Sequence, residues 1–118
     1  MTRRNKNLGD WGEVQACNFL TRHGFSVVER NYHTTMGEID IVATKGDDYY
    51  FIEVKTRRGS DFANDDAITY SKKIRLRKAV RAYCYSRGIG NKSLILAGLI
   101  IEVKKVEGKL GFRFCVIV

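Results

Sequence analysis

Two strand-like segments joined by a glycine-containing turn constrain this sequence more than any other feature. Residues 38–45 and 48–56 carry the β-branched and aromatic side chains that are typical of strands. Between them lies the pair Gly46-Asp47, and glycine in the first position suits a two-residue type II′ turn. The sequence therefore predicts an antiparallel β-hairpin over residues 38–56.

The predicted turn also fixes which residues of the hairpin face each other. In an antiparallel pair the numbers of opposed residues have a constant sum, so a turn that pairs Lys45 with Asp48 fixes every other pair. Asp40 then lies directly opposite Glu53, with both carboxylates on one face of the sheet. Strand alternation places Lys55 on the same face as Glu53. Two acids and one lysine are therefore expected around a common space.

This predicted group of Asp40, Glu53 and Lys55 matches the needs of phosphodiester hydrolysis. Opposed carboxylates repel each other, and a bound divalent cation offsets that repulsion. Carboxylate oxygens are hard ligands that suit Mg²⁺ or Mn²⁺. Such a cation activates water and polarises a phosphoryl group, while Lys55 would position the water or stabilise developing charge. The alternative for Glu53 and Lys55 is an ordinary ion pair on an exposed strand face.

Two further acidic residues are candidates near this group. Glu13 lies on the apolar stripe of a helix predicted over residues 9–23, so its carboxylate is expected to face inward. It could approach the metal through water or bind a second ion; equally, it could reach solvent or pair with an arginine. Glu38 shares a strand face with Asp40, and we expect it to be exposed at the rim.

A second predicted helix, over residues 71–87 with Ser71 as its cap, carries most of the excess positive charge. The net charge of the chain is +8, and this helix has basic residues but no acidic one. A basic surface of this kind indicates a polyanionic partner such as nucleic acid, with a plain solvated face as the alternative. The predicted phosphate contacts are Lys72, Lys73, Arg77 and Arg81 on the helix and Arg57 in a loop expected over residues 57–69.

The remaining segments complete an α/β fold of order αβββαββ. Further strands are predicted over residues 25–30, 94–103 and 110–118, and the long apolar run of the second suits a strand buried on both faces. We expect a single domain over residues 1–118, in which residues 1–8 form a flexible basic N-terminus. The predicted architecture is a central mixed sheet of about five strands flanked by helices.

Composition argues against several other classes of protein. Cys17, Cys84 and Cys115 are few and widely separated, so we expect core side chains rather than disulfides or zinc ligands. His23 and His33 are isolated and are not expected to bind metal. No apolar run approaches the roughly 20 residues of a membrane span, and no hydrophobic signal segment follows the basic start. A cytoplasmic protein without membrane association is therefore expected.

Six short motifs, spread over most of residues 9–103, carry a family resemblance. They are WGEVQA at 11–16, RN at 30–31, GEIDIVA at 37–43, FIEVKTR at 51–57, SKK at 71–73 and AY at 82–83. Together they resemble the YraN-like family of the PD-(D/E)XK nuclease superfamily. In two places the sequence departs from that pattern: Ile39 replaces the superfamily's proline, and Leu96-Ala97-Gly98 replaces an Arg-Phe-Asp motif.

The resemblance implies a restriction-endonuclease-like fold with assigned roles for four residues. Asp40 and Glu53 would be metal ligands, Lys55 the catalytic lysine and Glu13 the acidic residue of the helix. A more distant similarity to archaeal Holliday-junction resolvases, which act as dimers on branched DNA, implies branched DNA and a homodimer as hypotheses.

Two further functions compete with a Mg²⁺- or Mn²⁺-dependent endonuclease acting on DNA. The first is a non-catalytic module that keeps the nuclease fold and binds nucleic acid. The second is a structural or protein-binding module. Salt separates this last function from the other two, because phosphate binding weakens steeply as salt rises.

Overall fold

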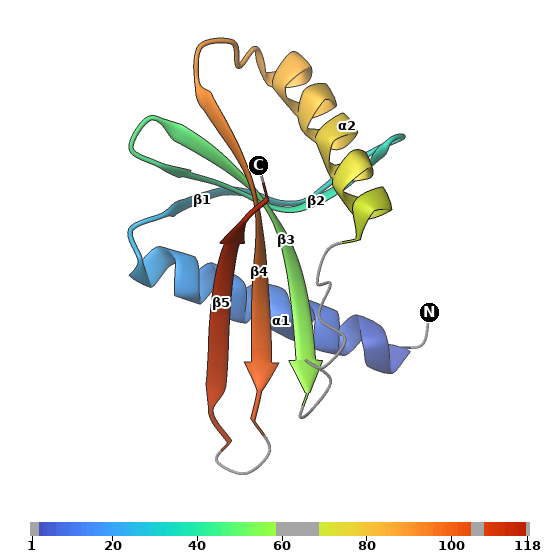
Figure 1. The fold of residues 1–118 in the computed structure, drawn as a ribbon, viewed down its shortest axis with the longest axis vertical. Coiled ribbons are helices and arrows are strands. Elements are labelled where there is room, and N and C mark those ends of the chain that lie inside the picture. The colour runs from blue at the N-terminus through green and yellow to red at the C-terminus, as the bar shows by residue number, and fades with distance from the viewer. Residues whose placement is uncertain (1–2, 59–68, 105–107, 118) are drawn as a thin grey trace.

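The computed structural model describes residues 3–58, 69–104 and 108–117, which form two helices and five strands (Figure 1). Their bounds are α1 Arg3–Arg22, β1 Ser26–Thr34, β2 Gly37–Lys45, β3 Asp48–Arg58, α2 Tyr70–Arg87, β4 Ser93–Val103 and β5 Leu110–Val116. The predicted α/β class and the predicted order αβββαββ are both confirmed.

The strands form one mixed sheet in the order β1-β2-β3-β4-β5. Neighbouring strands are antiparallel except β3 and β4, which are parallel. A parallel pair needs a crossover connection, and α2 lies in that connection. The prediction of a mixed sheet flanked by helices is therefore confirmed.

The two helices cover opposite faces of this sheet. Ile52 packs in a cluster with Leu20 of α1, whereas its neighbour Phe51 packs in a second cluster with Leu76 and Tyr83 of α2. Adjacent strand residues point to opposite faces, so the clusters lie on opposite sides. Figure 1 shows α1 running behind β3, β4 and β5. In the described part of the chain, neither helix has the length and apolar character needed to cross a membrane.

A glycine sets the close contact between α1 and β3. Gly12 is buried, and a Cβ atom at this position would collide with the hydroxyl group of Thr56. Gly9 lies one helical turn earlier and has no such neighbour. The approach of α1 to the sheet therefore depends on the missing side chain of Gly12, which also places the next residue, Glu13, at the helix–sheet boundary.

Both helices begin elsewhere than predicted. α1 starts at Arg3, before the predicted start at Gly9, so it includes most of the segment expected to be a flexible basic N-terminus. α2 starts at Tyr70, and its cap is Thr69, not Ser71. Thr69 has the extended backbone of an N-cap, and its hydroxyl group accepts a hydrogen bond from the Lys72 N–H at 3.3 Å.

Several strand ends also differ from the prediction. β1 continues past residue 30 to Thr34 through Asn31, whose φ of 52° is unusual in a strand. β3 continues into the segment expected to be a loop, because its parallel pairing with β4 extends to Arg58 and Val103. The rest of that expected loop, residues 59–68, lies outside the described residues, as does residue 118 of the last predicted strand.

The three cysteines are free, but only two of them lie against the core. Cys17 and Cys84 are partly buried against the two hydrophobic clusters, as predicted. Cys115 is exposed, so the prediction of a core side chain is wrong there. Its neighbour Phe114 packs toward the α1 cluster, and strand alternation turns Cys115 to the other face.

Candidate active site

The hairpin that holds the candidate site has the predicted register. Lys45 pairs with Asp48, and the ladder continues to the pair Ile41 and Ile52. Gly46 has a φ of 62°, and Asp47 is not among the described residues with positive φ, which fits a type II′ turn. Register is therefore set by the turn over the whole paired part of β2 and β3.

Asp40 and Glu53 are the next residue on each strand, at the point where this ladder ends. We call them the carboxylate pair. Oδ2 of Asp40 accepts a hydrogen bond from the Val54 N–H at 2.8 Å, so a side chain replaces a backbone carbonyl as the partner of β3. The side chains of Asp40 and Glu53 are also hydrogen-bonded to each other. The predicted proximity of the two acids is therefore confirmed.

Burial and repulsion dominate the electrostatics of the carboxylate pair. Asp40 is only 7% exposed, and its burial, followed by the charge of Glu53, raises its pKa from 3.8 to about 7. Burial also raises the pKa of Glu53, against the opposing charges of Lys72 and Arg75. The protonated form of Asp40 is therefore favoured up to about pH 7, and in this form its hydroxyl group can donate a hydrogen bond to Glu53.

The chemistry of this donor set fits a hard divalent cation. Asp40 is buried and Glu53 is partly buried, so a cation bound between their carboxylates would offset both the burial and the repulsion. Within residues 3–58, 69–104 and 108–117, no three His, Cys, Asp or Glu side chains come together as a metal-binding group. The two carboxylates of the pair suit Mg²⁺ or Mn²⁺, for which water and substrate phosphate commonly supply the other ligands.

Lys55 lies on the same side of the sheet as Glu53. Its neighbours Val54 and Thr56 both face α1, since Val54 packs against the α1 cluster and Thr56 lies against Gly12. Strand alternation then turns the partly buried Lys55 to the opposite face, where Glu53 lies. The predicted placement of these two side chains is confirmed.

Glu13 adopts one of the two arrangements predicted for it. Its Oε1 lies 3.5 Å from Nη2 of Arg30, and its side chain is also hydrogen-bonded to Asn31. Its charge still contributes to the raised pKa of Asp40, so it lies near the carboxylate pair. Glu13 does not join the pair in a three-ligand group, and a role through water or a second ion stays a prediction.

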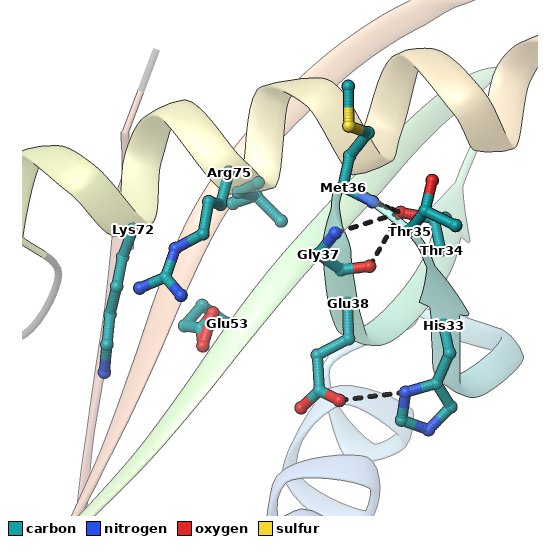
Figure 2. A pocket seen from close by; sticks show the side chains of 10 residues that line it. His33, Thr34, Thr35, Met36, Gly37, Glu38, Glu53, Lys72 and Arg75 are labelled. Carbon is teal, nitrogen blue, oxygen red and sulfur yellow. Dashed lines mark hydrogen bonds and ion pairs between the residues drawn. The ribbon is translucent and has the colours of Figure 1, made fainter.

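Beside the carboxylate pair, a cavity of about 560 Å³ opens between α2, the β1–β2 turn and β3. Lys72 and Arg75 reach from α2 toward Glu53 (Figure 2). Of these, Lys72 was predicted as a phosphate contact, but Arg75 was missed, although its spacing of three residues from Lys72 places both on one helix face. The cavity thus joins positive charge to the candidate metal ligands.

The opposite wall of the cavity comes from the end of the β1–β2 hairpin. Residues 34–37 form the turn, and an ion pair of 3.0 Å joins Nδ1 of His33 to Glu38 (Figure 2). Glu38 is exposed, as predicted. No sequence signal identified residues 34–37 as part of a site.

The other predicted phosphate contacts lie outside this cavity. Arg77 and Arg81 are exposed on α2, and Lys73 is partly buried. Arg57 lies within β3 and is only 6% exposed, so the prediction of a loop at this residue is wrong, while its contact with phosphate stays a prediction. The physical reason is the continued pairing of β3 with β4, which extends the strand through Arg57.

Comparison with known proteins identifies relatives over most of the chain. The family model described as Uncharacterised protein family UPF0102 matches residues 12–118. A UPF0102 protein of Alkaliphilus oremlandii is 37% identical over 106 residues, which are 89% of this chain and 91% of that protein. UPF0102 proteins of Syntrophomonas wolfei and Roseiflexus castenholzii are 43% and 45% identical over 70% of this chain, and these matches cover 72% and 68% of the two relatives.

Proposed function

This chain belongs to the uncharacterised protein family UPF0102, the YraN-like family that its motifs resemble, and we propose that it is a divalent-metal-dependent endonuclease acting on DNA. The observation that carries the proposal is the carboxylate pair at the end of the β2–β3 ladder, where Asp40 is buried and Lys55 lies on the same side of the sheet as Glu53. The charge of Glu53 raises the proton affinity of the buried Asp40, and a structural role alone gives no reason to place two acids together at this point of the sheet.

Each member of the group has a task in hydrolysis of a phosphodiester. Asp40 and Glu53 would hold Mg²⁺ or Mn²⁺, which when bound supplies positive charge that polarises a phosphoryl group and activates water. The Val54 N–H fixes one oxygen of Asp40, so the orientation of this carboxylate is set before any ligand arrives. Lys55 would orient the attacking water or stabilise charge that develops on the phosphate oxygens.

The basic helix supports DNA as the substrate. Lys72 and Arg75 lower the pKa of Glu53, so the positive charge of α2 reaches the carboxylate pair. A phosphate bound by these side chains would therefore lie next to the candidate metal ligands. The resemblance to Holliday-junction resolvases adds branched DNA in repair or recombination as a hypothesis, while a homodimer and a cytoplasmic location stay predictions.

A cleavage assay with matched variants tests this proposal. Wild-type protein with Mn²⁺ should cut linear, single-stranded or branched DNA, and EDTA should abolish cleavage. Asp40→Asn should lower the rate of cleavage by more than about 100-fold. A smaller effect is typical of a group that only orients a metal ligand, whose loss costs at most about 100-fold. Lys55→Met should lower it by about 100- to 1000-fold.

Asp47→Asn is the control, because it removes a carboxylate from the same hairpin at a fully solvated turn position. This variant should cut DNA at the wild-type rate. If wild type, Asp40→Asn and Lys55→Met cut DNA equally, the proposal is wrong. Tight, salt-sensitive binding with no cleavage by any of them would instead support a non-catalytic nucleic-acid-binding module.

A further inference from the structure

The cavity beside Glu53 has the size of a small-molecule site. Its volume of about 560 Å³ lies within the range of roughly 300–1000 Å³ that is usual for pockets enclosing a small ligand. A double helix cannot enter such a space, whereas a single nucleotide can, as in enzymes that take one nucleotide out of the stack. The size of the cavity therefore argues for one unpaired nucleotide.

The charges around the cavity are divided between its two sides. Lys72 and Arg75 line the α2 side and reach toward Glu53 (Figure 2). On the other side, Glu38 lies 3.0 Å from Nδ1 of His33, and its negative charge helps to raise the pKa of Glu53. An anionic group is therefore most stable beside α2, between the two basic side chains and the carboxylate pair.

The hairpin side of the cavity is fixed by its own hydrogen bonds. Thr34 Oγ1 accepts hydrogen bonds from the N–H groups of Met36 and Gly37, at 3.0 and 3.1 Å, and donates to the Gly37 carbonyl. Gly37 also lies against α2, since a Cβ atom there would be only 3.2 Å from the Arg75 carbonyl oxygen. The turn thus keeps its place against the helix and offers no spare N–H at these two positions to a phosphate.

Apolar atoms line the same space. Leu76 is buried at the cavity wall, and Met36, also a lining residue, is half exposed. A flat, mostly apolar base can lie against such side chains while the attached phosphate stays near the basic wall. The combination of one cationic side and apolar lining matches a nucleotide better than it matches free phosphate.

We propose that this cavity holds one unpaired nucleotide of a DNA strand, with its phosphate between Lys72 and Arg75. The proposal rests on the proposed nuclease function and names its substrate class, which is DNA with single-stranded or extruded nucleotides. Arg75 then selects the substrate, because it contacts the phosphate of the nucleotide that enters the cavity.

Binding measured in EDTA tests the proposal without requiring cleavage. The probes are three labelled DNAs of one sequence: a single strand, a duplex with one bulged nucleotide, and a continuous duplex. Fluorescence anisotropy gives their affinities, and 2-aminopurine at the bulge reports whether the base is unstacked. Wild type should bind the single strand and the bulged duplex about tenfold more tightly than the continuous duplex. This factor is what one additional charge-assisted hydrogen bond to the phosphate would contribute.

Two substitutions on α2 provide the comparison. Arg75→Gln should remove most of the preference for unpaired DNA, and Arg75→Lys should retain part of it. Lys78→Gln removes the same charge from an exposed position that does not line the cavity. This control should weaken binding to all three DNAs by the same factor, because it changes only the general attraction to phosphates.

Several outcomes would overturn the proposal. Equal wild-type affinity for the three DNAs is one, and identical behaviour of Arg75→Gln and Lys78→Gln is another. A third is tight binding of free thymidine monophosphate without any preference among the DNAs, which would assign the cavity to a small-molecule nucleotide. The nuclease function can fail separately. In that case wild type shows no cleavage in Mn²⁺, but the preference for unpaired DNA measured in EDTA persists.

Discussion

The effect of pH on the stability of Asp40→Asn is the most direct physical test of the carboxylate pair. Burial and the charge of Glu53 raise the pKa of Asp40 from 3.8 to about 7. In the unfolded chain this carboxyl group has its ordinary pKa, so between these two values the unfolded state releases a proton that the folded state keeps. The stabilising contribution of protonated Asp40 to the folded state is therefore fully present below about pH 4. It is lost as the pH rises through about 7.

The size of that loss follows from the pKa change. Each pKa unit corresponds to about 1.4 kcal/mol, so the rise from 3.8 to about 7 lowers the free energy of unfolding by about 4 kcal/mol. An asparagine at this position keeps the hydrogen bonds of the neutral acid, because its carbonyl accepts from Val54 N–H and its amide donates to Glu53. Asp40→Asn should therefore match wild type near pH 4 and exceed it by up to about 4 kcal/mol near pH 8.

Urea unfolding followed by circular dichroism, in EDTA at a series of pH values, gives the measurement. Asp47→Asn is the control, since the Asp47 side chain is 97% exposed, and its stability should follow wild type at every pH. Parallel curves for wild type and Asp40→Asn would refute the reasoning. In a separate series without EDTA, Mg²⁺ at about 100 times its dissociation constant should raise the free energy of unfolding of wild type by about 2.7 kcal/mol, and that of Asp40→Asn by much less.

Three other predictions test the fold and the basic helix. Gly12→Ala should destabilise the protein by about 1–3 kcal/mol through overpacking against β3, whereas Gly9→Ala, in open space on the same helix, should stabilise it by about 0.5–1 kcal/mol in a thermal melt. Thr69→Ala should cost about 1 kcal/mol in urea unfolding, and Thr69→Ser should cost little, because serine keeps the capping oxygen. Combining Lys72→Ala with Arg77→Ala should reduce the slope of log affinity against log salt by about 0.9 for each duplex phosphate that the variant no longer neutralises; an unchanged slope would show that these side chains do not bind phosphates.

Local pattern was sufficient to predict the carboxylate pair. The turn at Gly46 and the two-residue period of the strands fix the register, so the relation between Asp40 and Glu53 depends only on residues close in sequence. The side shared by Glu53 and Lys55 follows from the same period. The element order was predictable for a similar reason, since helical and strand periods differ along the chain.

Relations between distant elements were not predictable in the same way. Nothing near Arg57 in sequence indicates that β4 pairs alongside it and buries it. The pairing of Glu13 with Arg30 joins α1 to β1, and sequence reasoning left it as one of two alternatives. Cys115 was assigned to the core because its segment is apolar, but the face it occupies depends on which side of β5 the helix α1 covers.

By itself, the sequence determined the α/β class, the hairpin register, the proximity of two acids and the side of the sheet that Lys55 shares with Glu53, because each of these follows from short-range periodicity and turn geometry. Only the tertiary structure decided what surrounds them. The cavity exists because the crossover brings Arg75 of α2 against Gly37 of the β1–β2 turn. That packing joins residues far apart in the chain, and it is set by how whole elements fit together rather than by any local pattern.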